Sequence, residues 1–111
     1  MKLYSIRYIF LSNGKSPIID WLNSLDSITK KRINQRILRI QEGNFGDHKK
    51  INELISELRF FFGKGYRIYY AIVENTVVLL INGGDKSKQS DDVKKATEIF
   101  NEWRLLNERI K

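Results

Sequence analysis

Two arginines and one tyrosine recur at strand spacing in the middle of the chain. Arg59 lies in an alternating segment, Ile55–Phe62, and Arg67 and Tyr69 lie in the next one, Tyr66–Val73. Side chains two residues apart on a strand point to the same face. If the more apolar faces meet the helices, these three side chains emerge on one side of two adjacent strands. We therefore expect a concave, basic surface with an aromatic ring beside it.

Such a surface suits cleavage of an RNA phosphodiester by the neighbouring 2′-hydroxyl. Negative charge builds on the phosphoryl oxygens as the hydroxyl attacks, and the planar fork of an arginine can brace two of them. Loss of one such stabiliser commonly costs ~10²–10³ in rate, and an aromatic ring can stack on a base. Arg59 and Arg67 could equally be solvated strand residues, with Tyr69 as half-buried packing, so geometry alone leaves both interpretations open.

The charge of the chain favours a polyanionic partner. Net charge is +7, from 20 basic and 13 acidic residues, and residues 30–67 hold ten basic residues against four acidic ones. An excess of this size in a small domain is typical of nucleic-acid binding, although solubility alone could explain it. One helix face carries no acidic residue, and we expect it to contact RNA or an acidic protein segment unless it is merely solvated. Its basic residues are Lys30, Lys31, Arg32, Arg36 and Arg39.

Several classes of protein are excluded by composition. The chain has no cysteine and a single histidine, His48, which we expect to be exposed and uninvolved. We therefore expect neither a metal site nor a cofactor. The first ten residues alternate and include Arg7, unlike a signal peptide, and no apolar run is long enough to span a membrane. We expect a cytoplasmic protein with one domain over residues 1–111.

The N-terminal third predicts a strand and a helical hairpin. Residues 2–10 alternate and are rich in β-branched and aromatic side chains, which favours a strand. Ser16 and Pro17 are typical of a helix N-cap and first helical position. Ser27 is the expected N-cap of a second helix that runs to about Glu42.

The remaining chain predicts three strands and a final helix. The strand segments are Ile55–Phe62, Tyr66–Val73 and Thr76–Asn82, and their short connections require antiparallel neighbours. Ser90 starts the last helix. The order β-α-α-β-β-β-α predicts an α+β fold, with helices packed on a small antiparallel sheet.

Short motifs spread over nearly the whole chain carry a family resemblance when taken in order. They are Pro17 with Trp21-Leu22, Gly43-Asn44-Phe45-Gly46-Asp47, Glu57-Leu58-Arg59, Phe62-Gly63-Lys64-Gly65-Tyr66-Arg67-Ile68-Tyr69-Tyr70, Leu79-Leu80, Gly83-Gly84-Asp85-Lys86-Ser87-Lys88-Gln89, and Asp92 with Ala96. In this order and spacing the chain resembles the phage-derived addiction-module killer family, a branch of the RelE/HigB toxin superfamily.

The resemblance implies a RelE-like fold and the toxin of a type II toxin–antitoxin pair. Such toxins cut mRNA without a metal, often on the translating ribosome, and stop growth. It implies catalytic roles for Arg59, Arg67 and Lys86. The expected RNA-binding residues are Tyr69, Lys64, Lys88, Arg32, Arg36 and Arg39. The implied partners are mRNA, the ribosome and a HigA-like helix-turn-helix antitoxin, with operator DNA bound only through the toxin–antitoxin complex.

One departure from the family keeps other functions open. Several relatives use a tyrosine or histidine near the C-terminus for proton transfer, whereas this chain has no tyrosine after Tyr70 and no histidine after His48. The general acid and base are therefore unassigned, with Lys86, Tyr69 and Glu57 as candidates. The alternatives are a non-enzymatic, ParE-like inhibitor of DNA gyrase and an RNA- or ribosome-binding module without cleavage.

Overall fold

The computed structural model describes residues 2–110 of the chain, with side chains up to residue 107. Within these residues the elements follow in the order β-α-α-β-β-β-β-α, with one 3-10 turn before the last helix. Their bounds are β1 Ser5–Tyr8, α1 Pro17–Asn23, α2 Ser27–Ile40, β2 His48–Lys50, β3 Ser56–Arg59, β4 Arg67–Val73, β5 Val77–Gly84, η1 Lys86–Lys88 and α3 Gln89–Ile110. The fold is α+β, as predicted.

The sheet differs from the predicted one in two respects. Its strand order is β1-β5-β4-β3-β2, and β1 runs parallel to β5, so the sheet is mixed rather than antiparallel. A parallel neighbour is possible because the whole helical hairpin lies between β1 and the later strands. The second difference is β2, a three-residue edge strand that pairs antiparallel with β3 in a segment predicted as loop.

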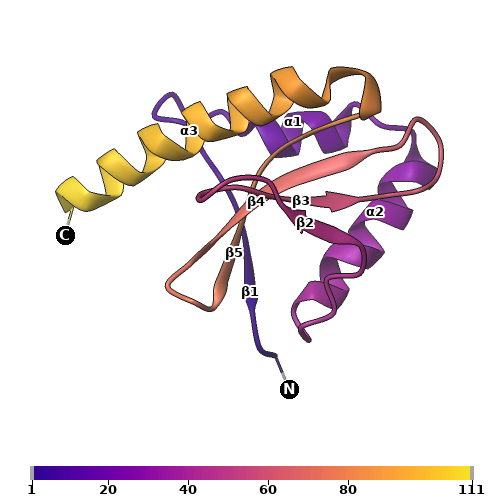
Figure 1. Ribbon diagram of the computed structural model, residues 1–111, viewed down its shortest axis with the longest axis horizontal. Helices are drawn as coiled ribbons and strands as arrows, with labels where there is room; N and C mark the ends of the chain where they lie inside the picture. Colours follow the sequence, from indigo (N-terminus) through magenta and orange to yellow (C-terminus); the bar gives the residue numbers. More distant parts are fainter. Residues whose placement is uncertain (1, 111) are drawn as a thin grey trace.

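Helices cover both faces of the sheet. Helices α1 and α2 bury a cluster with Leu58, Ile68 and Leu80 on one face. Helix α3 packs against β4 and β5 on the other face, where Ala96 and Phe100 meet the second cluster. Figure 1 shows α3 lying along the sheet, with its C-terminal end extending past the strands. The face predicted to be open therefore lies partly beneath a helix.

The helix starts follow capping chemistry, with one correction. The Ser16 hydroxyl accepts from the Ile19 amide, so the predicted N-cap of α1 is confirmed. The prediction of Ser27 as the second N-cap is wrong, because the Asp26 carboxylate accepts from the Thr29 amide at 2.8 Å. These hydrogen bonds lower the pKa of Asp26. Carboxylates cap helices as well as hydroxyls do. Asp26 is therefore the N-cap of α2, and Ser27 is its first helical residue.

A bulge near the end of β5 brings two helices close to the sheet. Tyr69 pairs with Asn82 and Tyr70 pairs with Leu80, so β5 carries one extra residue. A Cβ atom on Gly83 would lie 2.3 Å from the Trp21 ring of α1, and one on Gly84 would lie 1.9 Å from Asp92 Oδ2 of α3. Both glycines therefore allow a close helix–sheet approach.

Candidate functional site

Two rows of side chains cross the sheet on the face that α3 covers, and the predicted arginines lie together in the first of them. In the first row Arg59 pairs with Arg67, Arg67 pairs with Gly84, and the Arg59 amide donates to the Asp47 carbonyl at 2.9 Å. The second row consists of Lys49, Glu57, Tyr69 and Asn82, each paired with the next. The structure therefore brings Arg59 and Arg67 together on one face, as the spacing predicts.

Each arginine has a carboxylate partner. Arg59 Nη2 lies 2.9 Å from Asp47 Oδ1, and about a third of each side chain is exposed. This hydrogen bond raises the pKa of Arg59. Arg67 Nη1 lies 3.4 Å from Glu57 Oε1, with 13% of the Arg67 side chain exposed. Like charges directly opposite each other destabilise a sheet, and the two carboxylates offset that repulsion.

Glu57 is the most enclosed charged group of the site. Its side chain is 1% exposed, and Gln89 of α3 donates to its Oε2 at 3.1 Å. Gln89 and Asp92 are polar residues on the buried stripe of α3, which continues through Val93 and Ala96. A helical spacing that places polar residues on an apolar stripe is a sequence signal that could have identified them.

The structure contradicts the prediction that Tyr69 stacks on RNA. Tyr69 is fully buried under α3, and burial, with a contribution from Glu57, raises the pKa of its phenol well above the usual range. The Tyr69 hydroxyl, Asn82 Oδ1 and Asp92 Oδ2 are buried without a hydrogen-bond partner. The alternation placed Tyr69 on the correct face, but the apolar cover came from α3, which the prediction assigned to the other side.

Lysines surround the open end of the arginine row. The Lys86 amide donates to the Lys64 carbonyl at 3.4 Å, and both side chains line a shallow hollow with Asp85 and Ser87. Lys86, Lys88 and Lys64 are all exposed. Hydrogen bonds from Ser87 lower the pKa of Asp85, so this carboxylate remains ionised among the lysines.

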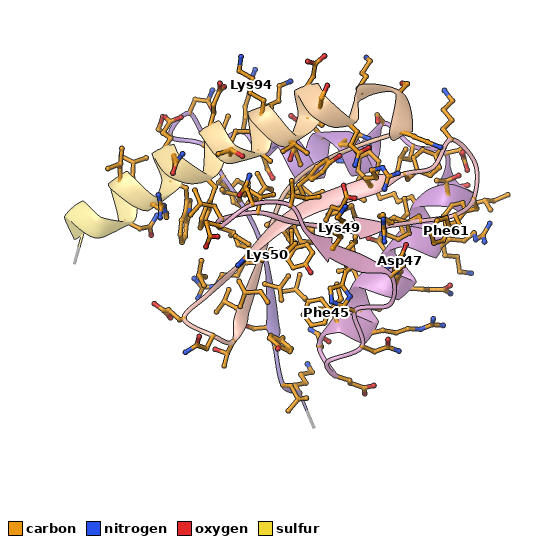
Figure 2. All side chains as sticks on the ribbon, in the orientation of Figure 1. Phe45, Asp47, Lys49, Lys50, Phe61 and Lys94 are labelled. Atoms are coloured by element: carbon orange, nitrogen blue, oxygen red, sulfur yellow. The ribbon has the colours of Figure 1, made fainter. Side chains whose placement is uncertain are left out.

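Lys49 is a functional candidate that the sequence analysis missed. It pairs with Glu57 across β2 and β3 and is exposed. Figure 2 shows Lys49 in the middle of the sheet region, between Lys50 and Asp47. The polar run His48-Lys49-Lys50 has no apolar alternation, so nothing in the local pattern indicated a strand. The exposed His48 pairs with Leu58 and has its ring 5.5 Å from that of Phe45, with Nδ1 2.9 Å from the Gly46 carbonyl.

The guanidinium of Arg36 binds the backbone of the protein and is not directed to solvent, contrary to the prediction. Its guanidinium donates to the carbonyls of Arg59, Phe45 and Asp47, with the Phe45 distance at 3.0 Å. It also lies 4.5 Å from the centre of the Phe60 ring, and burial lowers the pKa of Arg36. The side chain thus joins α2 to β3 and the preceding loop, and the predicted direct contact between Arg36 and RNA is wrong for this arrangement.

The other predicted arginines of α2 are exposed. The Arg32 guanidinium carbon lies 3.7 Å from the centre of the Phe62 ring. Arg39 is exposed near the helix C-terminus, where a cation is favourable. Both are therefore free to meet a polyanion on the opposite face of the sheet from Arg67.

A separate cavity of about 420 Å³ lies under the C-terminal half of α3. Its lining includes Ile72, Val77, Phe100 and Trp103. Ile72 is near the end of β4 and Val77 at the start of β5, whereas Phe100 and Trp103 belong to α3, and neither Arg59 nor Arg67 lines the cavity. Among the described residues, no group of three or more His, Cys, Asp or Glu side chains is placed to hold a metal ion.

Comparison with known proteins places the chain in a family. The sequence pattern of the phage-derived, Gp49-like proteins matches residues 20–102. The chain belongs to the Gp49-like family. This family is known for addiction-module, toxin-like proteins, so the chain is related to toxin-like proteins.

A second comparison agrees with this assignment. The Gp49-like chain is 46% identical over 86 residues to an uncharacterised protein of Haemophilus influenzae, and the match covers 77% of this chain and 87% of the relative. Because that relative is uncharacterised, the match assigns no activity to this chain. None of the helices in residues 2–110 is long and apolar enough to cross a membrane.

Proposed function

We propose that the chain is the toxin of a type II toxin–antitoxin system and acts as a RelE/HigB-type endoribonuclease. Its substrate is mRNA, cut in the cytoplasm and on the ribosome, without a metal or cofactor. A HigA-like helix-turn-helix antitoxin neutralises it, and operator DNA is bound only through the toxin–antitoxin complex. Membership of a toxin-like family supports the assignment of the chain as a toxin.

The proposed ribonuclease activity rests on the direct pairing of Arg59 with Arg67. Two guanidinium groups opposite each other on adjacent strands destabilise the sheet unless an anion joins them. Their present partners are the carboxylates of Asp47 and Glu57. A phosphodiester is an anion of similar geometry, and it can replace a carboxylate on an arginine fork.

The reaction begins when the 2′-hydroxyl attacks the adjacent phosphorus; the bond from phosphorus to the 5′-oxygen breaks, and this oxygen leaves as a hydroxyl after taking a proton from solvent. Arg59 and Arg67 stabilise the charge that develops on the phosphoryl oxygens, and Lys86 adds a third positive charge from the rim. Glu57 is the carboxylate beside Arg67 and accepts the hydroxyl proton. Because Gln89 covers Glu57, the first turn of α3 must shift before RNA reaches this carboxylate.

Expression in a bacterial host tests the proposal. Induced wild-type chain and Arg67→Ala are compared by growth and by mapping of mRNA 5′ ends. We expect growth arrest and new cleavage sites with the wild type, and neither with Arg67→Ala. The control is Lys94→Ala, because Lys94 is exposed on α3, lies outside the predicted site and should leave cleavage largely intact.

The outcome separates the proposal from the ParE-like alternative. Growth arrest with intact mRNA would contradict the ribonuclease and direct the search to DNA gyrase. RNA binding without growth arrest or new 5′ ends would instead indicate a binding module. A folded Arg67→Ala protein, shown by an unchanged circular dichroism spectrum, is required for the comparison because Glu57 loses its ion pair in this variant.

A further inference from the structure

The loop between β3 and β4 exposes one aromatic side chain. Phe61 is 85% exposed, the largest exposure among the large apolar side chains that the structure describes. Figure 2 shows Phe61 at the end of the sheet, beyond Asp47. Exposed single hydrophobic residues are common in proteins, so its surroundings decide whether this ring has a role.

The other aromatic residues of the loop are packed and hold it in one shape. Phe60 is 4% exposed, and its ring lies 6.1 Å from that of Phe62, which in turn lies 5.8 Å from Tyr66. Arg32 covers the Phe62 ring from α2. The loop also turns tightly at Gly63, where φ is +59° and a Cβ would meet the Tyr66 ring. These contacts thus fix the conformation of the loop that carries Phe61.

Phe61 follows the arginine row. The Phe60 amide donates to the Tyr66 carbonyl at 2.9 Å, so the β3–β4 pairing continues past Arg59. Alternation along this extended segment places Phe61 beyond Arg59, roughly 6.6 Å further along the chain. Lys64 lies in the same loop, and its carbonyl binds the Lys86 amide. The exposed ring therefore lies on the segment between Arg59 and Arg67, which also carries Lys64.

We propose that Phe61 stacks on an unpaired base of the RNA, next to the phosphate that Arg59 and Arg67 bind. An aromatic ring beside cations fits single-stranded nucleic acid, because bases stack on the ring while lysine and arginine follow the backbone. This role replaces the one predicted for the buried Tyr69. The inference rests on the proposed ribonuclease function and makes the substrate a single-stranded segment.

Binding of a non-cleavable RNA tests this role apart from catalysis. The probe is a fluorescein-labelled, single-stranded oligonucleotide with 2′-O-methyl groups on every ribose, titrated with the full chain and followed by anisotropy. We expect Phe61→Ala to weaken binding about tenfold, because stacking on one base contributes about that factor or more. Phe61→Trp should restore affinity, whereas Phe61→Leu should not. The control is Leu105→Ala, which removes a comparably apolar side chain, 61% exposed, toward the C-terminal end of α3.

The salt dependence of binding distinguishes the ring from the charges. Phe61→Ala should leave the slope of log affinity against log salt unchanged, whereas Arg59→Ala should reduce it by about one phosphate contact. Phe61→Ala should keep the thermal midpoint of the wild type within the range of the Leu105→Ala control, since 85% of the Phe61 side chain is exposed.

Four outcomes would overturn the inference. Equal affinities of Phe61→Ala and wild type would remove the stacking role. Full rescue by Phe61→Leu would show apolar contact rather than stacking. If the wild-type chain neither binds the probe nor cuts mRNA, the proposed function fails first. If it cuts mRNA and Phe61→Ala cuts equally well at the same sites, only the stacking role fails.

Discussion

Arg36 and Arg67 come from the same basic segment but lie on opposite faces of the sheet and have different surroundings. Arg36 donates to three backbone carbonyls and lies over an aromatic ring. Arg67 has one ion-pair partner, Glu57, at 3.4 Å, whereas the Nε atom of both arginines is buried without a hydrogen bond. The first arrangement uses the guanidinium to build the fold, and the second leaves its binding capacity available to a phosphate. Net charge alone does not distinguish these two uses.

The two regions are also connected. Two of the carbonyls that Arg36 binds belong to Arg59 and Asp47, which form the other ion pair of the site. Arg36 therefore holds the backbone of the site from behind, while the site side chains point to the α3 face. We expect substitutions at Arg36 to change stability and those at Arg67 to change catalysis.

The largest expected effect is that of Arg67→Lys on cleavage. The lysine keeps a positive charge opposite Glu57, so the fold should be retained, but the bidentate fork is lost. We expect the rate of RNA cleavage to fall by ~10²–10³. The rate is measured with purified protein and ribosomes programmed with a labelled mRNA, alongside Arg104→Lys at an exposed position of α3. Equal rates for wild type and Arg67→Lys would remove the distinction between the two arginines.

Arg36→Ala should have the next largest effect, on stability. It removes charge-assisted hydrogen bonds to part-buried carbonyls, each of which typically contributes ~1.5–3 kcal/mol. We expect the free energy of unfolding in urea to fall by about 3 kcal/mol, with no change in the salt dependence of RNA binding by the folded protein. Arg39→Ala, at an exposed position, should stay within ~0.5 kcal/mol of wild type. A stable Arg36→Ala protein with weakened RNA binding would reverse the assignment.

Asp92→Asn should have a smaller, pH-dependent effect. Burial raises the pKa of Asp92 above its ordinary value of 3.8. The folded state therefore favours the protonated form, and wild-type stability contributed by this group is lost as pH rises through the folded pKa. Urea unfolding at several pH values should show Asp92→Asn gaining stability relative to wild type as pH rises above 3.8.

The same experiment contains its own control for other carboxylates. The lowered pKa values of Asp26 and Asp85 change stability in the opposite direction, because the folded state favours their charged forms. Both groups are present in the two proteins compared, so their contributions cancel in the difference. A difference that is independent of pH would show that the Asp92 carboxyl is not disfavoured in its charged form.

Local patterns predicted most of the elements. The alternation around Arg59 and Arg67 placed them on one face of adjacent strands, and Ser16-Pro17 fixed the start of α1. These features depend on neighbours in sequence, where period and capping chemistry act directly. The core stripe of α2 also follows from helical spacing.

Features that depend on distant contacts could not be predicted in the same way. The parallel pairing of β1 with β5 joins residues far apart in sequence, and β2 is a polar strand formed only because β3 supplies its partner. Tyr69 and Glu57 are buried because α3 covers their face of the sheet and not the opposite face. The periodicity of α3 shows that it has a buried side but not which face of the sheet meets it.

The most direct test of the account is the chemistry of the RNA ends produced by the wild-type chain. Attack by the 2′-hydroxyl, with Arg59 and Arg67 stabilising the phosphoryl oxygens, leaves a 2′,3′-cyclic phosphate on one fragment and a 5′-hydroxyl on the other. We expect both ends at every new site in cells that express the wild type, and at none in cells that express Arg67→Ala. Fragments with 5′-phosphate ends, or growth arrest without new ends, would contradict the account.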